Sequence, residues 1–241
     1  MAKIGLDIGH GRNTFPPSKG VYKNGAGHHE YDANSRVAKQ LEKKLKVAGH
    51  TVVMAQPYNA NDVALITRTN RYIAEKVDLI MSLHANAGGA AASGYAAFYR
   101  QGDARAKHLS DLYEAELVAQ GFKLWGGSRP SMPTGWSNFH MCRVPSQNGI
   151  PSILLENGFM TNAGDFEWIF GDKKDEYAEK CATAAFNAAQ NFLGEKPESV
   201  NSQPVNKPAS TPSTGKAKTD AQLADEVIAG KHGSVMLVKI H

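Results

Sequence analysis

Residues 77–87 read Val-Asp-Leu-Ile-Met-Ser-Leu-His-Ala-Asn-Ala, and this stretch decides the fold. Its apolar run has the length of a strand buried on both faces, which is typical of a parallel sheet covered by helices. The run ends in small and polar residues, and His84 lies at that end. Because ligands of open α/β sheets bind beyond the carboxyl ends of the strands, this position favours a functional role for His84.

Two other segments repeat this pattern of an apolar strand with a polar end. Residues 3–8 alternate apolar side chains and stop at Gly9-His10-Gly11, and residues 151–156 end in the carboxylate of Glu156. Helices are predicted at residues 29–48, from Asn61 onward, at 104–119 and at 177–193, and further strands at 51–55, 94–99 and 138–144. We therefore expect an α/β fold with a single twisted, mostly parallel sheet flanked by helices on both faces.

Changes in composition divide the chain. Residues 1–193 carry the strand and helix patterns, whereas residues 194–219 contain four prolines and many Ser and Thr residues, which predicts an extended linker. Residues 220–241 form a segment too short to bury a core by itself. Within the first part, residues 12–27 and 121–138 are rich in Gly and Pro and are predicted to be long loops. Trp125 and Trp136 of the second loop could line a glycan groove or pin the loop.

The composition excludes several classes of protein. The chain has 241 residues, of which 41% are hydrophobic, and its net charge is +4 without a dense basic cluster, which argues against a nucleic-acid partner. No apolar run is long enough for membrane insertion. The first residues lack the regions of a signal peptide, so we expect synthesis in the cytoplasm. Cys142, expected on a strand, and Cys181, expected on a helix, are predicted to be buried thiols rather than parts of a disulfide framework.

Three strand ends supply His10, His84 and Glu156, and Glu30 lies in the first turn of the helix at 29–48. Two neutral imidazoles and one carboxylate, with a fourth position open to water, are the ligand set of catalytic zinc. A second carboxylate can take a proton from the water and pass it to the leaving nitrogen of an amide.

Simpler interpretations exist for both acids. Glu30 could be a helix N-terminal acid favoured by the dipole, with His28 or His29 in its place as ligand. Glu156 could pair with a base, although an acid directly after two leucines is costly to desolvate and therefore needs a partner.

Four blocks together resemble the zinc-dependent N-acetylmuramoyl-L-alanine amidases used as autolysins and phage endolysins. The blocks are residues 5–11, Glu30 at a helix start, Leu65 with Arg68 before residues 78–87, and residues 151–162. The resemblance covers residues 1–193 and implies that His10, Glu30 and His84 bind Zn²⁺ and that Glu156 is the catalytic carboxylate. Arg12 and Tyr31 depart from the pattern, since many members have Gly and Lys there.

The resemblance implies a peptidoglycan hydrolase that cleaves the amide between N-acetylmuramic acid and L-alanine and reaches the cell wall after holin-type release. The alternatives are a zinc peptidase or deacetylase that acts on another bond of the cell wall, and an inactive wall-binding module. Asn86 and Arg143 are candidate substrate-binding residues, although each could equally cap a loop or pair with an acid. Residues 223–233 resemble the start of a wall-binding repeat, and the apolar tail from Val235 to His241 could support self-association through an exposed strand.

Overall fold

A six-stranded sheet forms the centre of the computed structural model, which describes residues 1–194. Its strands are β1 (Lys3–Ile8), β4 (Thr51–Val53), β5 (Leu79–Asn86), β6 (Ala96–Arg100), β7 (Arg129–Ser131) and β8 (Ser152–Phe159), in the order β4-β1-β5-β8-β6-β7. Neighbouring strands are parallel except β6 and β8, which are antiparallel. The expectation of a mostly parallel sheet is confirmed.

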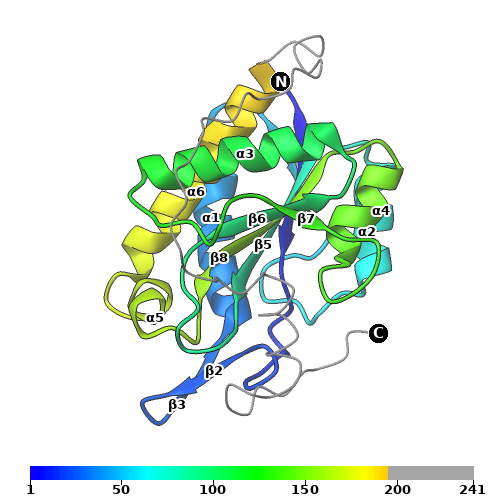
Figure 1. Ribbon diagram of the computed structural model, residues 1–241. Helices are drawn as coiled ribbons and strands as arrows, with labels where there is room; N and C mark the ends of the chain where they lie inside the picture. The colour runs from blue at the N-terminus through cyan, green and yellow to red at the C-terminus, as the bar shows by residue number, and fades with distance from the viewer. Residues whose placement is uncertain (195–241) are drawn as a thin grey trace.

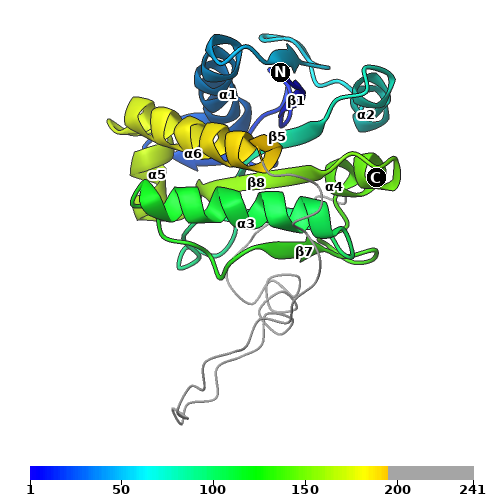
Figure 2. The same cartoon turned by 90° about the horizontal axis from the view of Figure 1, so that it is seen from above.

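Helices cover both faces of this sheet, as the sequence predicts. They are α1 (Glu30–Val47), α2 (Leu65–Ala74), α3 (Ala104–Ala119), α4 (His140–Gln147), α5 (Ala163–Ile169) and α6 (Lys174–Gly194). Seen from above, α1, α6 and α3 lie on one side of the strands, and α2 and α4 lie on the other (Figure 2). The larger hydrophobic cluster joins the first group of helices to alternate strand residues such as Leu83, while Ile80 faces Tyr72 of α2 and Met141 of α4.

Helix α1 positions the first acid of the site. Its apolar residues Ala33, Val37, Leu41 and Leu45 recur four residues apart and are fully or almost fully buried against the sheet. Gly49 follows the helix with φ +84°, and its N–H donates to the carbonyl of Lys46, as expected for a glycine that ends a helix. Glu30 is the first residue of α1, at the end that faces the carboxyl edge of the sheet.

The prediction of a strand at 138–144 is wrong, because residues 140–147 form helix α4. Pro145 lies inside this helix and has no N–H to donate to the carbonyl of Met141. The hydroxyl of Ser152 donates to that carbonyl instead, at 2.6 Å, so a contact distant in sequence compensates for the proline. Cys142 is therefore on a helix rather than a strand, although it is a buried thiol as predicted, like Cys181.

The segment 12–27 is less irregular than the sequence suggests. It contains strand β2 (Gly20–Lys23), and β3 (Ala26–His29) follows in an antiparallel hairpin. Asn24 and Gly25 form the turn of this hairpin, and both have positive φ. Asn-Gly is a preferred sequence for a two-residue hairpin turn because both residues tolerate this conformation. The hairpin projects from the lower end of the molecule in Figure 1, next to the carboxyl ends of the central strands.

Two further differences concern segment boundaries. Helix α2 begins at Leu65 rather than near Asn61, and the carboxylate of Asp62 accepts a hydrogen bond from Arg68 instead of capping the helix. Strand β7 and helix α5 were not predicted. No helix in residues 1–194 combines the length and apolarity that crossing a bilayer requires. Apart from Gly194, the linker expected at 194–219 and the segment at 220–241, with its wall-binding repeat and self-association, lie outside the described residues.

Candidate metal centre and active site

His10 follows β1 in the left-handed conformation, with φ +64°. This conformation is uncommon for a residue with a side chain. The flanking glycines permit close packing there, because a Cβ at Gly9 would lie 2.4 Å from Cε1 of His84, and one at Gly11 would lie 2.0 Å from the main-chain nitrogen of Asp62. Neighbouring protein groups, rather than a ligand, therefore require both glycines.

Glu30 lies between the two histidines. Its Oε2 is 3.0 Å from Nε2 of His10, and its Oε1 is 3.0 Å from Nδ1 of His84. Oε1 also accepts hydrogen bonds from the main-chain N–H of Ala85 at 3.2 Å and from Nδ2 of Asn34 at 3.3 Å. The imidazole rings meet edge to face, with centroids 5.0 Å apart. The three side chains predicted as metal ligands are thus brought together.

Charge in this cluster favours an ionised Glu30. Burial alone would raise the pKa of Glu30, but His10 and His84 hold its pKa well below the usual value through charge and hydrogen bonds. Burial alone would lower the pKa of His84, yet the hydrogen bond and charge of Glu30 raise it. Glu30 and His84 therefore stabilise each other's charged form, and a cation at the same point would supply the positive charge that favours an ionised Glu30.

Glu156 is paired with His84 in the register of β5 and β8. Its Oε2 is buried and has no hydrogen-bond partner among residues 1–194. Burial raises the pKa of Glu156 to about 8, and the negative charge of Glu30 contributes to the rise, while His84 and Lys19 oppose it. An acid that is buried without a partner is costly unless a ligand or a proton compensates for it. Glu156 therefore has the properties of a group that transfers protons near neutral pH.

The residues present fit a zinc ion. One ligand atom from each of His10, Glu30 and His84 lies within 4.8 Å of the other two. Tetrahedral zinc with bonds of about 2.1 Å separates its ligands by about 3.4 Å, not far from the 3.0 Å between Glu30 and each histidine. Two imidazole nitrogens and a carboxylate oxygen are a donor set that zinc accepts, and the uncompensated oxygen of Glu156 marks a polar site beside them.

A network on the other side of His10 was not predicted from the sequence. Arg68 is buried and donates to the main-chain carbonyls of Ile8 at 2.6 Å and of His10 at 3.5 Å. Gln56 also donates to the carbonyl of His10. Asp7 accepts from Arg68 at 3.2 Å and from Ser82 at 2.6 Å, which pairs the buried charges. The backbone that carries His10 is therefore held by side chains from the α2 face of the sheet.

The other candidate residues lie outside this cluster. His28 packs against the rings of Phe166 and Phe170, and His29 hydrogen-bonds to the carbonyl of Thr14, so neither replaces Glu30 as a ligand. Asn86 accepts from the N–H of Ala87, and Arg143 donates to Asn138. No hydrogen bond or ion pair within the described chain joins Asn86 or Arg143 to the three ligands, and their substrate-binding roles remain predictions.

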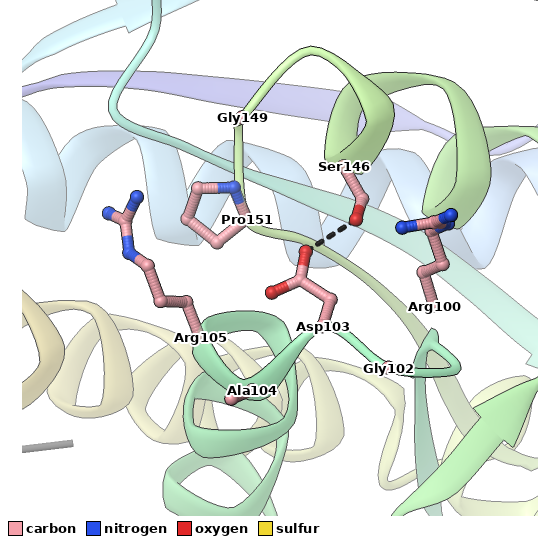
Figure 3. Close-up of a pocket in the computed structure, with 8 residues that line it drawn as sticks. All are labelled: Arg100, Gly102, Asp103, Ala104, Arg105, Ser146, Gly149 and Pro151. Atoms are coloured by element: carbon pink, nitrogen blue, oxygen red, sulfur yellow. Dashed lines mark hydrogen bonds between the residues drawn. The ribbon is translucent and has the colours of Figure 1, made fainter. Parts of the chain in front are cut away.

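A cavity of about 330 Å³ lies at the opposite end of the sheet (Figure 3). Its lining includes Arg100, where β6 ends, and Pro151, which directly precedes β8. Asp103 faces this cavity, but its carboxylate already accepts from Ser146 at 2.5 Å and from the N–H of Ala106 at the start of α3. Glu156 comes five residues after Pro151 along the strand, about 16.5 Å at 3.3 Å per residue, so this cavity is not part of the site.

A comparison with protein families identifies the chain. Residues 4–191, which include all four residues of the site, match the family described as N-acetylmuramoyl-L-alanine amidase. The chain belongs to this family. The match extends over nearly all of the described structure, from β1 to α6, so the family assignment applies to the whole folded unit.

Individual relatives and a solved structure are similar to this chain over most of its length. The chain is 28% identical to YqiI of Bacillus subtilis (strain 168), an uncharacterized protein, over 190 residues that cover 78% of this chain and 82% of YqiI. It is 27% identical to the N-acetylmuramoyl-L-alanine amidase LytC of the same strain over 192 residues, which are 78% of this chain but 35% of LytC. The catalytic domain of the amidase CwlV from Bacillus (Paenibacillus) polymyxa var. colistinus shares the fold, with a TM-score of 0.67, 23% identity and coverage of 81% of this chain and 100% of that domain.

Proposed function

We propose that this member of the amidase family is a zinc-dependent peptidoglycan hydrolase that cleaves the amide between N-acetylmuramic acid and L-alanine. One observation carries the proposal: His10, Glu30 and His84 converge on one point beside the unpaired Oε2 of Glu156. Membership in the N-acetylmuramoyl-L-alanine amidase family supports the same bond as the target.

The roles of the residues follow from their chemistry. His10, Glu30 and His84 would hold the ion through two nitrogens and one oxygen. Bound zinc supplies Lewis-acid polarisation of the amide carbonyl and of the attacking water. Glu156 takes a proton from that water as its oxygen attacks the carbonyl carbon. Glu156 then gives the proton to the nitrogen as the carbon–nitrogen bond breaks, so that the lactyl group leaves as a carboxylic acid and L-alanine as an amine.

The electrostatics of Glu156 suit both halves of this cycle. Because burial raises its pKa to about 8, the carboxyl group is a stronger base than an exposed glutamate and retains an abstracted proton long enough to deliver it. Glu30 stays ionised because its pKa is held low by the two histidines, which suits a ligand rather than a proton carrier. Glu30 thus suits metal binding, and Glu156 suits proton transfer.

Mass spectrometry of digested cell walls tests the proposal. Incubation of purified peptidoglycan with the full chain and Zn²⁺ should release stem peptides with new L-alanine amino termini and leave glycan strands with free lactyl carboxylates. A chelator should stop the release, and added Zn²⁺ should restore it. New amino termini at other residues would indicate a peptidase, and acetate would indicate a deacetylase. Either result, or binding to walls without any cleavage, would contradict the proposal.

A further inference from the structure

Four exposed apolar side chains lie at the start of α2 and in the loop before α4. Among residues 1–194, nine large apolar side chains are exposed, and four of them are Leu65 and Ile66 at the start of α2, and Met132 and Trp136 in the loop before α4. Helices α2 and α4 lie on the same face of the sheet, and Thr69 of α2 hydrogen-bonds to His140 of α4. Large apolar side chains left exposed on one face of a domain often mark a binding surface.

His84 and Glu156 point toward this face. Side chains alternate along a strand, and Leu83 and Leu155 belong to the core on the opposite face, with α1, α3 and α6. Their neighbours His84 and Glu156 therefore project on the α2 and α4 side. The exposed apolar residues of α2 and of the loop before α4 thus lie on the same face of the sheet as the candidate catalytic groups.

The register of the strands gives the position of Trp136 relative to Glu156. The indole of Trp136 meets the ring of Phe98 edge to face, with centroids 5.9 Å apart. Phe98 pairs with Leu154 in the sheet, and Leu154 is two residues before Glu156 on the same face. Trp136 therefore contacts a position only about 7 Å along the strand from Glu156.

The loop before α4 starts at the other end of β6 and reaches back to this position. Ser131, which pairs with Arg100 at the end of β6, donates its hydroxyl to the carbonyl of Ser137. From this anchor the indole of Trp136 extends to Phe98, which is level with Leu154 of β8.

The two tryptophans of this loop have different surroundings. The guanidinium of Arg129 lies 3.8 Å over the ring of Trp125, and Phe159 packs against its edge, so Trp125 pins the loop. Trp136 is 50% exposed. Its loop is nevertheless fixed, because the hydroxyl of Ser131 donates to the carbonyl of Ser137 at 2.6 Å and Asn138 donates to the carbonyl of Pro133 at 2.8 Å. A large aromatic ring is thus presented to solvent on a braced loop, which lowers the entropy cost of binding.

We propose that Trp136 is a stacking platform for a sugar ring of the peptidoglycan glycan strand. The flat, weakly polar face of an N-acetylhexosamine carries C–H groups, which match the negative face of an indole. The peptide stem begins with alanine and carries carboxylates, which offer the indole little apolar area and the wrong charge. This assignment rests on the proposed amidase function, because it places the sugar that bears the scissile lactyl amide beside Glu156.

Binding of peptide-free sugar tests this assignment without any turnover. The full-length Glu156→Gln variant is titrated with the disaccharide of N-acetylglucosamine and N-acetylmuramic acid while tryptophan emission is recorded. We expect a saturable change that Trp136→Ala abolishes and Trp136→Phe weakens. In the active protein, Trp136→Ala should raise KM for glycan-linked muropeptides about tenfold, equivalent to about 1.4 kcal/mol, with kcat changed less than twofold.

Trp168→Ala is the matched control, because Trp168 packs against Phe122 on the opposite face of the sheet and should alter neither sugar binding nor KM. Trp136→Leu, which keeps apolar contact with Phe98, separates stacking from folding and should bind as poorly as Trp136→Ala while melting close to the wild type. Equal sugar binding by wild type and Trp136→Ala overturns the assignment, as does a response to the stem peptide alone. Absence of wall cleavage by the wild type contradicts the proposed function instead, and the sugar titration still decides the role of Trp136.

Discussion

His84 and Glu156 are partners across the hydrogen bonds of β5 and β8, and their side chains emerge from the same face of the sheet. The backbone ladder therefore fixes the separation between a candidate metal ligand and the candidate proton carrier. Glu30, in contrast, reaches the site from the first turn of α1 and is oriented by Asn34 and the N–H of Ala85. Strand pairing therefore positions His84 and Glu156, whereas hydrogen bonds to its side chain position Glu30.

Replacement of Glu156 by glutamine should abolish turnover and retain the metal. The amide keeps the size of the side chain but cannot accept and return a proton, so we expect a loss of about 10²–10⁴-fold in kcat. Zinc content, measured on the purified protein, should stay at the wild-type level. Glu167→Gln, an exposed acid on α5, serves as the control and should remain active. Wild-type activity of Glu156→Gln would remove Glu156 from the mechanism.

Replacement of Glu30 by glutamine should eliminate zinc binding. The variant leaves two imidazoles without the charge that holds them together, and a neutral amide oxygen is a weak zinc ligand. The measurement is the zinc-to-protein ratio after dialysis against a defined free-zinc buffer. Asp32→Asn changes an exposed acid in the same helical turn and should leave this ratio unchanged. A full complement of zinc in Glu30→Gln would contradict the proposed ligand set.

The sequence predicts most of the fold because the central strands and long helices have strong periodic patterns. Helix α3 occupies residues 104–119 as predicted, and β1 occupies residues 3–8. Helix α4 was missed because seven residues with a following proline fit a short strand as well as a helix. The hydrogen bond from Ser152 to the carbonyl of Met141 favours the helix over the strand. It joins two segments that no sequence pattern identifies as neighbours.

The convergence of His10, His84 and Glu156 was predictable for a similar reason. Parallel strands bring their carboxyl ends to one edge, so three strands with polar ends indicate a shared site. The support of His10 by Arg68 and Gln56 was not predictable, because these side chains bind main-chain carbonyls 58 and 46 residues away. Any residue offers a carbonyl, so the sequence carries no sign of which one is chosen.

Gly9→Ala should disturb the candidate metal site through His84. The added Cβ would lie 2.4 Å from Cε1 of His84 and 2.5 Å from the carbonyl oxygen of Leu83, distances that require movement of the ring or the strand. We expect a loss of about 1–3 kcal/mol in the free energy of unfolding together with weaker zinc binding. Gly89→Ala is the control, because nothing lies within 4 Å of a Cβ there. Unchanged stability and zinc affinity in Gly9→Ala would refute this account of the close approach.

Arg68→Met should weaken zinc binding although Arg68 touches none of the ligand atoms. Its guanidinium holds the carbonyls of Ile8 and His10, and loss of such outer contacts typically lowers metal affinity about 10–100-fold. Because the change leaves the buried Asp7 carboxylate without its ion-pair partner and should destabilise the protein, Gln56→Met provides a milder test through the same carbonyl of His10. Competition with a zinc chelator measures the affinity. Arg71→Met, on the exposed side of α2, should bind zinc like the wild type, and normal affinity in both test variants would exclude the positioning role.

Glu114→Gln should change how stability depends on pH. Glu114 is buried and accepts from the N–H of Ala97 at 2.9 Å, and burial raises its pKa from 4.5 to about 7. The folded state therefore binds this proton more tightly than the unfolded state, so the wild type loses stability as the pH rises from about 4.5 to 7 and remains less stable above it. A glutamine has no proton to lose, and its advantage over the wild type should grow by an amount on the order of 2–3 kcal/mol between pH 4 and pH 8. Urea unfolding at both pH values measures the difference, with Glu116→Gln on the same helix as the control. A constant difference between Glu114→Gln and wild type across this range would show that folding does not raise the pKa of Glu114.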